Sequence, residues 1–72
     1  MGGVFVNRVK EFRKLRKLTQ IELAREVGVA RQTINLIEND KYNPTLALCI
    51  SLAKVLKTDL NTLFWESEDF EG

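Results

Sequence analysis

The sequence contains no histidine, a single cysteine and no long apolar run, and each of these shortages excludes a class of function. Without His there is no imidazole to serve as a general base or a metal ligand near neutral pH. One Cys can form neither an internal disulfide nor a cysteine zinc cluster. The longest uncharged run, residues 42–53, has 12 residues, whereas a membrane-spanning helix needs about 20. We therefore expect a protein that is not an enzyme, holds no metal or other cofactor, shows no small-molecule site and does not enter a membrane.

A chain of 72 residues allows one small domain. Its hydrophobic content of 44% and charged content of 29% are those of a globular protein. No long apolar segment follows Met1, so we expect no secretory leader and a cytoplasmic location. We interpret residues 1–72 as a single domain with its core at 7–64 and an acidic tail at 66–72.

The net charge of +1 hides an uneven distribution. Residues 1–65 hold all 11 Lys and Arg but only six of the ten acidic residues, a net charge of +5, and residues 66–72 hold the other four acids. A cationic body favours a polyanionic partner. A solvated helix face explains the same charge equally well, so charge alone leaves both interpretations open.

Apolar periodicity and capping residues predict five helices and an all-α fold. Val9, Phe12 and Leu15 recur on one face of the first helix, and the apolar fourth helix is expected to be the central core helix. Short strands are allowed at both chain ends, where the apolar run 4–6 could also be a plug under the first helix. The expected helices cover about residues 7–17, 20–27, 31–39, 45–56 and a short segment after a cap at Asp59.

Residues 19–39 carry the most information. Thr19 and Glu22 have the spacing of a capping box, which starts a helix. Gly28 stands where that helix must stop, in the left-handed conformation that glycine adopts without cost. Two short helices joined by such a turn pack at a steep angle, which leaves the second helix protruding.

The outer face of the protruding helix is mostly polar. Arginine can bind guanine through two hydrogen bonds, and glutamine or asparagine can bind adenine in the same way. Set after this turn, the face favours contact with DNA bases, although taken alone it would be an ordinary solvated face. Its residues follow from helical spacing: Arg31, Gln32, Asn35, Leu36 and Asn39.

The same stretch resembles the helix-turn-helix of the Cro/repressor-type (XRE) regulators. The resemblance rests on TQIELAREVGVARQTINLIENDKYNP at 19–44 and continues through NPTLALCISLAKVLKTDLNTLF at 43–64. It covers about residues 7–64 and implies a five-helix, lambda-repressor-like DNA-binding domain. The size of the chain and its short apolar ends are most similar to the minimal dimeric repressors of the cytolysin-repressor-like subgroup.

The resemblance implies a repressor that binds a palindromic operator in double-stranded DNA as a homodimer. It implies an ion pair between Arg13 and Glu38, and it implies that Gln20 binds phosphate and helps to orient Gln32. Leu36 is expected to contact a thymine methyl group or only to cover the fourth helix. The implied base contacts are Arg31, Gln32, Asn35 and Leu36. The implied contacts to the DNA backbone are Thr19, Gln20, Thr33, Asn39, Lys41, Tyr42 and Asn43.

Several apolar and aromatic residues lie near the chain ends, where a short chain has little core to absorb them. We expect them at the dimer interface, with closure of the monomer core as the alternative. The residues are Val4, Phe5, Val6, Leu63, Phe64 and Trp65.

Three positions depart from the family pattern. Ala30 stands where a capping Ser is usual, and Lys17 and Lys57 stand where Gly or Asn usually ends a helix. The alternative function is an antitoxin-like or adaptor module that uses the same fold to bind a protein. Only about eight residues follow the fifth helix, too few for a segment that covers a toxin, and this favours the regulator.

Overall fold

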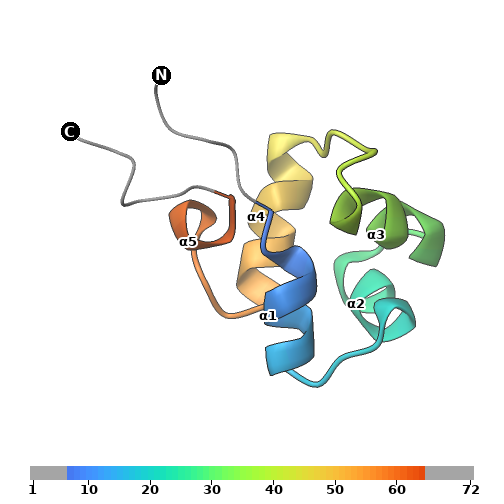
Figure 1. Ribbon diagram of the computed structural model, residues 1–72, viewed down its shortest axis with the longest axis horizontal. Coiled ribbons are helices and arrows are strands. Elements are labelled where there is room, and N and C mark those ends of the chain that lie inside the picture. The colour runs from blue at the N-terminus through green and yellow to red at the C-terminus, as the bar shows by residue number, and fades with distance from the viewer. Residues whose placement is uncertain (1–6, 65–72) are drawn as a thin grey trace.

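The computed structural model describes residues 7–64, which form five helices and, within that range, no strand (Figure 1). The expected bounds agree to within about two residues, and the predicted all-α class is confirmed. The strands allowed at the chain ends, the run 4–6 and the acidic tail lie outside the described residues. The helices are α1 Val9–Leu15, α2 Gln20–Val27, α3 Arg31–Glu38, α4 Leu46–Val55 and α5 Leu60–Phe64.

Three of the helices begin at the predicted side-chain caps, and at α5 the Asp59 carboxylate accepts a hydrogen bond from the Thr62 N–H at 2.7 Å. The Thr19 hydroxyl accepts a hydrogen bond from the Glu22 N–H at 3.0 Å, and the Glu22 carboxylate accepts one from the Thr19 N–H at 2.8 Å. The Thr45 hydroxyl accepts from the Leu48 N–H at 3.2 Å. These bonds satisfy N–H groups that the first turn of a helix leaves without partners. By contrast, α3 begins after Ala30 with no side-chain cap.

Four helix ends use the left-handed backbone conformation, and the one after α3 lies at Asp40, with a φ of 60°. Gly28 ends α2 with a φ of 81°, and a Cβ built there would meet nothing within 4 Å. Glycine is therefore favoured at this position by backbone conformation and not by close packing. Lys17 and Lys57, each with a φ of 59°, take the same conformation after α1 and α4.

Asn7 connects the beginning of α1 to the end of α3. Its side-chain oxygen accepts from the Val9 N–H at 3.0 Å, and its amide nitrogen donates to the Ile37 carbonyl and to the Asp40 carboxylate. The predicted position of the cap was wrong by one residue, because the N-cap is Arg8, which makes no side-chain capping bond. These bonds join two segments that are 30 residues apart in the chain.

The core is a single cluster to which all five helices contribute. One expectation about it was wrong. Leu15 was expected to face inward with Val9 and Phe12, but it is 63% exposed, because α1 ends there and the chain turns away. The fourth helix was expected to be the central core helix, and it packs against α2 and α5. Its buried side is formed by Leu52 and Ala53, whereas Leu46, at its first position, is 67% exposed.

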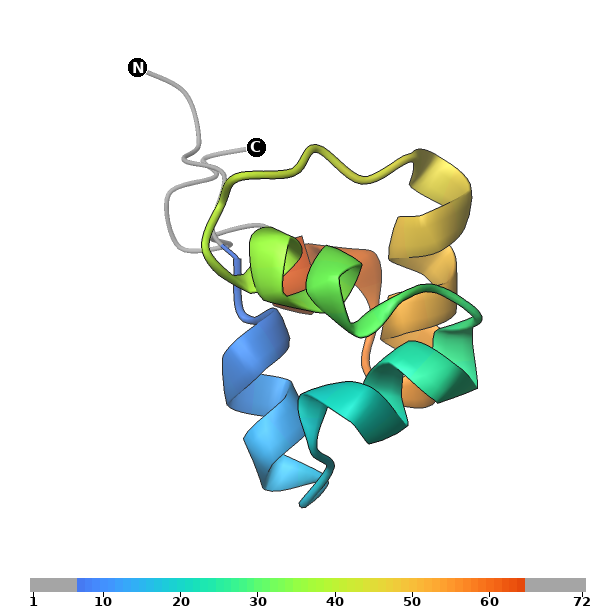
Figure 2. The same cartoon turned by 90° about the vertical axis from the view of Figure 1, so that its right-hand side faces the viewer.

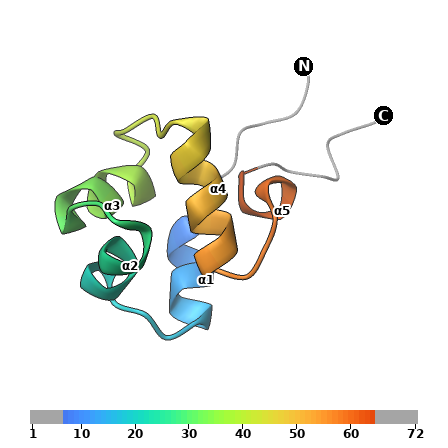
Figure 3. The same ribbon diagram turned by 180° about the vertical axis from the view of Figure 1, so that it is seen from behind.

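The helices divide the molecule into two sides. In Figure 1, α2 and α3 lie together on one side and α5 lies on the other, with α1 and α4 between them. Figure 2 views the α2–α3 side face on, with α5 behind, and Figure 3 shows α4 from the back, between that pair and α5. The contacts agree with these views, since α2 packs on α3 and α4 while α5 packs on α1 and α4. Within residues 7–64, no other helix covers the outer surface of α3.

Candidate nucleic-acid interface

The outer face of α3 is polar and exposed. Arg31, Gln32 and Asn35 are all exposed, and the opposite face of the helix is buried through Ile34 and Ile37. This is the amphipathic arrangement that the spacing predicts. Two further positions differ from the rest of the face: Thr33 and Leu36 are half-buried.

A buried ion pair connects α1 to the end of α3 on the side of α3 that faces the core. The Arg13 Nε lies 2.7 Å from Oε2 of Glu38, and its side chain also donates to the Leu18 carbonyl at 2.8 Å. The side chains of Arg13 and Glu38 are 11% and 2% exposed. The expected pair is present, and it joins α1 to the end of α3 where little water can weaken it.

Gln20 lies between this ion pair and the outer face of α3. Its amide nitrogen donates to Oε1 of Glu38 at 3.0 Å, and its amide oxygen accepts from Nη1 of Arg31 at 3.4 Å. Gln20 was expected to orient Gln32. Within residues 7–64 it bonds instead to Glu38 and Arg31, because α3 presents Arg31 toward the first turn of α2.

The loop after α3 is shaped by backbone hydrogen bonds. The Lys41 N–H donates to the Leu36 carbonyl at 2.8 Å, and Asp40 takes a left-handed φ of 60°. The Asn39 side chain donates to the Asn35 carbonyl at 2.8 Å, so part of its hydrogen-bonding capacity is used within the chain. Lys41, Tyr42 and Asn43 follow as exposed residues directly beyond the end of α3.

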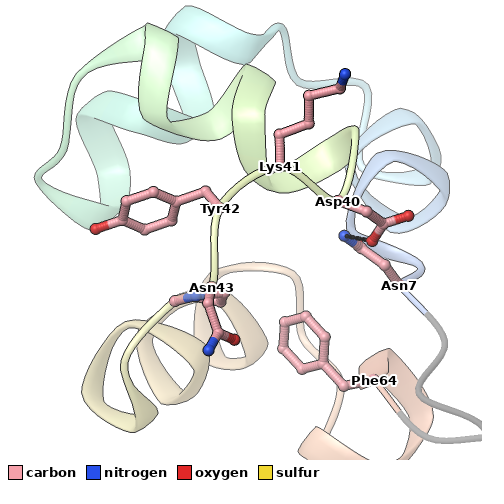
Figure 4. Close-up of a pocket in the computed structure, with 7 residues that line it drawn as sticks. Asn7, Asp40, Lys41, Tyr42, Asn43 and Phe64 are labelled. Atoms are coloured by element: carbon pink, nitrogen blue, oxygen red, sulfur yellow. Dashed lines mark hydrogen bonds between the residues drawn. The ribbon is translucent and has the colours of Figure 1, made fainter.

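A hollow of about 510 Å³ lies behind this loop. The ring of Phe64 points into the hollow, while the side chains of Lys41 and Tyr42 point away from it (Figure 4). Asn7 and Asp40 close one rim through their hydrogen bond, drawn as a dashed line in Figure 4. The loop thus presents the ammonium group of Lys41 and the phenol of Tyr42 on the side that faces away from the hollow.

The residues expected at a dimer interface fall into two groups. Val4, Phe5, Val6 and Trp65 lie outside the described residues. Leu63 and Phe64 are buried in the core of one chain, which leaves little of either side chain for a second chain.

The described residues contain one thiol, that of Cys49. Burial raises the pKa of the Cys49 thiol, so the thiol stays protonated at neutral pH on the half-buried part of α4. Among residues 7–64 no three His, Cys, Asp or Glu side chains cluster as a metal site would require. In the same range there is no helix with the length and apolar character of a membrane span.

Sequence reasoning missed two connections at this site. One is the contact of Gln20 with Arg31, and the other is the bond of Asn7 to the end of α3. Neither had a signal in the sequence, because each joins residues that only the packed helices bring together. The capping box, the turn glycine and the ion pair were all found in advance.

Known proteins share this arrangement. Residues 9–63 match the family model described as helix-turn-helix, and the chain belongs to this family, in its Cro/repressor (XRE) type. An uncharacterised HTH-type transcriptional regulator of Archaeoglobus fulgidus is 44% identical over 62 residues, which are 86% of this chain and 87% of the relative. The chain is thus a transcriptional regulator with a helix-turn-helix DNA-binding fold, and its relatives are regulators and not enzymes.

Two solved structures show similar folds. SinR of Bacillus subtilis, in complex with DNA, has a TM-score of 0.73 at 32% identity over 78% of this chain and 90% of the chain in that structure. A chain in the complex of SinR with SinI has the same TM-score, and this protein spans 55% of it. The P22 c2 repressor bound to a synthetic operator has a TM-score of 0.74 at 28% identity, over 78% of this chain and 85% of the repressor chain in that structure.

Proposed function

We propose that this regulator is a sequence-specific repressor that binds a palindromic operator in double-stranded DNA as a homodimer. The observation that carries the proposal is the exposed trio Arg31, Gln32 and Asn35, held outward on α3 by the buried pair of Arg13 and Glu38. The similarity to SinR and to the P22 c2 repressor, both solved with DNA, supports it. A repressor of this kind acts by occupying promoter DNA.

The bases would be read in the major groove by the outer face of α3. The guanidinium of Arg31 suits guanine, and the amides of Gln32 and Asn35 suit adenine. Leu36 is half-buried, so only its outer part would reach a thymine methyl group. Two copies of α3, related by a two-fold axis, would enter successive major grooves about 34–36 Å apart.

The DNA backbone would be held on either side of α3. The N–H groups at the first turn of α2, beginning at Gln20, lie at the positive end of a helix. The Thr19 hydroxyl accepts from Glu22 and can donate its own proton outward. Thr33, on the first turn of α3, is a further hydroxyl donor. Beyond the end of α3, the proposed phosphate contacts are Asn39, Lys41, Tyr42 and Asn43.

The proposal of a homodimer is based on apolar side chains that are exposed in a single chain. Leu46 and Ile50, one helical turn apart on α4, are both exposed. The terminal residues Val4, Phe5, Val6 and Trp65 would add to the interface, although they lie outside the described residues. A domain of this size buries a modest fraction of its surface alone and gains stability from a second copy.

Selection of binding sites from random duplex DNA tests the proposal directly. We expect enrichment of one inverted repeat whose half-sites lie about 10–10.5 base pairs apart, centre to centre. Absence of any enriched sequence would contradict a sequence-specific regulator and would favour the alternative, a protein-interaction module. That alternative draws on the exposed Leu46 and Ile50 and on the existence of the SinR–SinI complex.

Two variants separate base contact from phosphate contact. Gln32→Ala should weaken binding by about 1–3 kcal/mol and relax the preference at a single base pair. Lys41→Met should weaken all sequences alike and lower the slope of log K against log salt by about 0.9. Asn61→Ala and Lys54→Met, exposed changes on α5 and α4, are the matched controls and should leave both properties unchanged.

A further inference from the structure

The loop after α3, residues 39–43, contains one carboxylate among its proposed phosphate contacts. Asp40 stands between Asn39 and Lys41, and all three residues are exposed. A carboxylate that faced the DNA backbone would repel phosphate and offset the attraction of the neighbouring cation. The direction in which Asp40 points therefore bears on how tightly the loop can bind DNA.

The side chain of Asp40 points toward the start of α1. Its backbone takes a left-handed φ of 60°, and its N–H donates to the Ile37 carbonyl at 3.1 Å. Its Oδ1 accepts a hydrogen bond from Nδ2 of Asn7 at 3.2 Å. In Figure 4 the carboxylate lies beside Asn7 at the rim of the hollow, and the ammonium group of Lys41 points in another direction. The loop thus separates its anion from the cation that follows it.

The amide of Asn7 is itself held in one orientation. Its oxygen accepts from the Val9 N–H at 3.0 Å, so its NH₂ group faces the Ile37 carbonyl and Asp40. A turned amide would place its oxygen against these two acceptors and lose three hydrogen bonds. The next residue anchors the same segment, because the Arg8 N–H donates to a carbonyl of α5 at 2.9 Å. Asn7 therefore presents a donor of defined position to Asp40.

We propose that Asn7 holds the carboxylate of Asp40 away from the DNA backbone, so that Lys41 faces the phosphate strand without a competing negative charge. Asn7 is then a positioning residue for backbone contact, since it touches no DNA and acts through Asp40. The proposal rests on the proposed function, because it concerns how the loop after α3 meets phosphate. The bond between Asn7 and Asp40 is exposed, so its consequence is the direction of the carboxylate and not the stability of the fold.

A charged and a neutral variant of equal length test this inference with Asn7 left in place. Asp40→Glu carries the carboxylate one methylene beyond the reach of the Asn7 amide, and Asp40→Gln has the same shape without the charge. We expect Asp40→Glu to bind every duplex about tenfold less tightly than Asp40→Gln, or about threefold for each loop of a dimer, as for one charge several ångströms from a phosphate in water. The unmodified chain and Asp40→Asn, which keeps an acceptor for Asn7, should bind with closely similar affinity.

Asn7→Ser releases the carboxylate without changing any charge. Serine keeps an oxygen that can accept from the Val9 N–H and is too short to reach Asp40. The Ile37 carbonyl keeps its bond from the Asp40 N–H, so no acceptor is left without a partner there. We expect the affinity for all sequences to fall and the slope of log K against log salt to become shallower, because the freed charge opposes a phosphate contact.

The same change made in the Asp40→Asn background separates charge from shape. There Asn7→Ser releases no charge, so it should lower neither the affinity nor the salt slope. Asn61→Ser, the same substitution at an exposed position of α5, is the matched control and should leave both unchanged. Affinities are measured by titrating labelled operator and random duplex at several salt concentrations, below the melting temperature of each variant.

The outcomes distinguish the inference from the function on which it rests. If the unmodified chain binds no duplex DNA, the proposed function fails and the inference fails with it. If it binds DNA but Asp40→Glu and Asp40→Gln bind equally well, only the inference is overturned. An equal loss from Asn7→Ser with and without the Asp40 charge would show that Asn7 shapes the loop irrespective of charge, which also overturns it. Should Asn7→Ser not fold, the Glu and Gln variants decide alone.

Discussion

Two helices of similar length, α3 and α4, leave opposite kinds of surface exposed. The outer face of α3 is formed by the polar side chains of Arg31, Gln32 and Asn35, and its apolar side chains face the core. On α4, Leu46 and Ile50 are exposed although the helix also contributes Leu52 to the core. A polar exposed face suits a polar partner such as DNA, and an apolar exposed face suits a second protein surface. One chain thus leaves a polar surface exposed on α3 and an apolar surface exposed on α4.

The largest effect is expected from removing the support beneath α3. Glu38→Ala leaves Arg13 charged, 11% exposed and without its partner, a change that typically costs about 3–5 kcal/mol. The loss is a large fraction of the stability of any small domain, so the melting temperature should fall steeply. Thermal unfolding followed by circular dichroism measures it. Glu26→Ala on α2, which removes an exposed carboxylate, is the control and should stay within about 0.5 kcal/mol.

The buried and exposed sides of α4 can be compared by replacing one leucine on each side with alanine. Leu52→Ala removes a fully buried side chain and should cost about 2–5 kcal/mol. Leu46→Ala, six residues earlier, removes a side chain that is 67% exposed and should change the stability of the single chain little. Denaturant unfolding at low protein concentration gives both values. Equal costs would show that Leu46 is covered in solution, and a concentration-dependent cost would identify the cover as a second copy.

A smaller effect, and one that increases stability, is expected at the start of α3. Because α3 begins after Ala30 without a side-chain cap while α4 begins at Thr45 with one, Ala30→Ser should stabilise the protein by about 1 kcal/mol. Thr45→Ala should destabilise it by a similar amount. Urea unfolding of the two variants tests both signs. A loss of stability in Ala30→Ser would mean that the extended backbone at this position cannot present a capping hydroxyl.

The elements that could be predicted from the sequence are those with a local cause. The capping box of Thr19 and Glu22 and the turn at Gly28 involve residues three to nine positions apart, so α2 and the start of α3 were located correctly. The polar face of α3 followed from the same local periodicity. The ion pair of Arg13 with Glu38 joins distant residues, and the family resemblance supplied it.

What could not be predicted depends on packing between distant segments. Leu15, Leu46 and Ile50 are apolar residues at helical positions, and no pattern in the sequence distinguishes them from the apolar residues that the core buries. Gln20 could reach either Arg31 or Gln32 by sequence distance. Only the packing of α3 against α2 decides that its amide oxygen accepts from Arg31.

The smallest effect concerns the start of α5, the short helix on the side away from α3. Hydrogen bonding from Thr62, chiefly its backbone N–H at 2.7 Å, lowers the pKa of the exposed Asp59 carboxyl below its ordinary 3.8. Since the folded pKa is lower than the unfolded one, this contribution is fully present above the ordinary pKa. It is lost as the pH falls through the lowered value.

Asp59→Asn separates this titration from the capping itself. Asparagine keeps an oxygen acceptor for the Thr62 N–H and does not ionise in this range, so the variant should lack this acid-dependent loss. The difference in melting temperature between the unmodified protein and Asp59→Asn should therefore shift in favour of the variant on acidification from neutral pH to below the lowered pKa. An identical acid dependence in both proteins would mean that the charge of the Asp59 carboxylate adds nothing to the stability of α5 beyond what a neutral cap supplies.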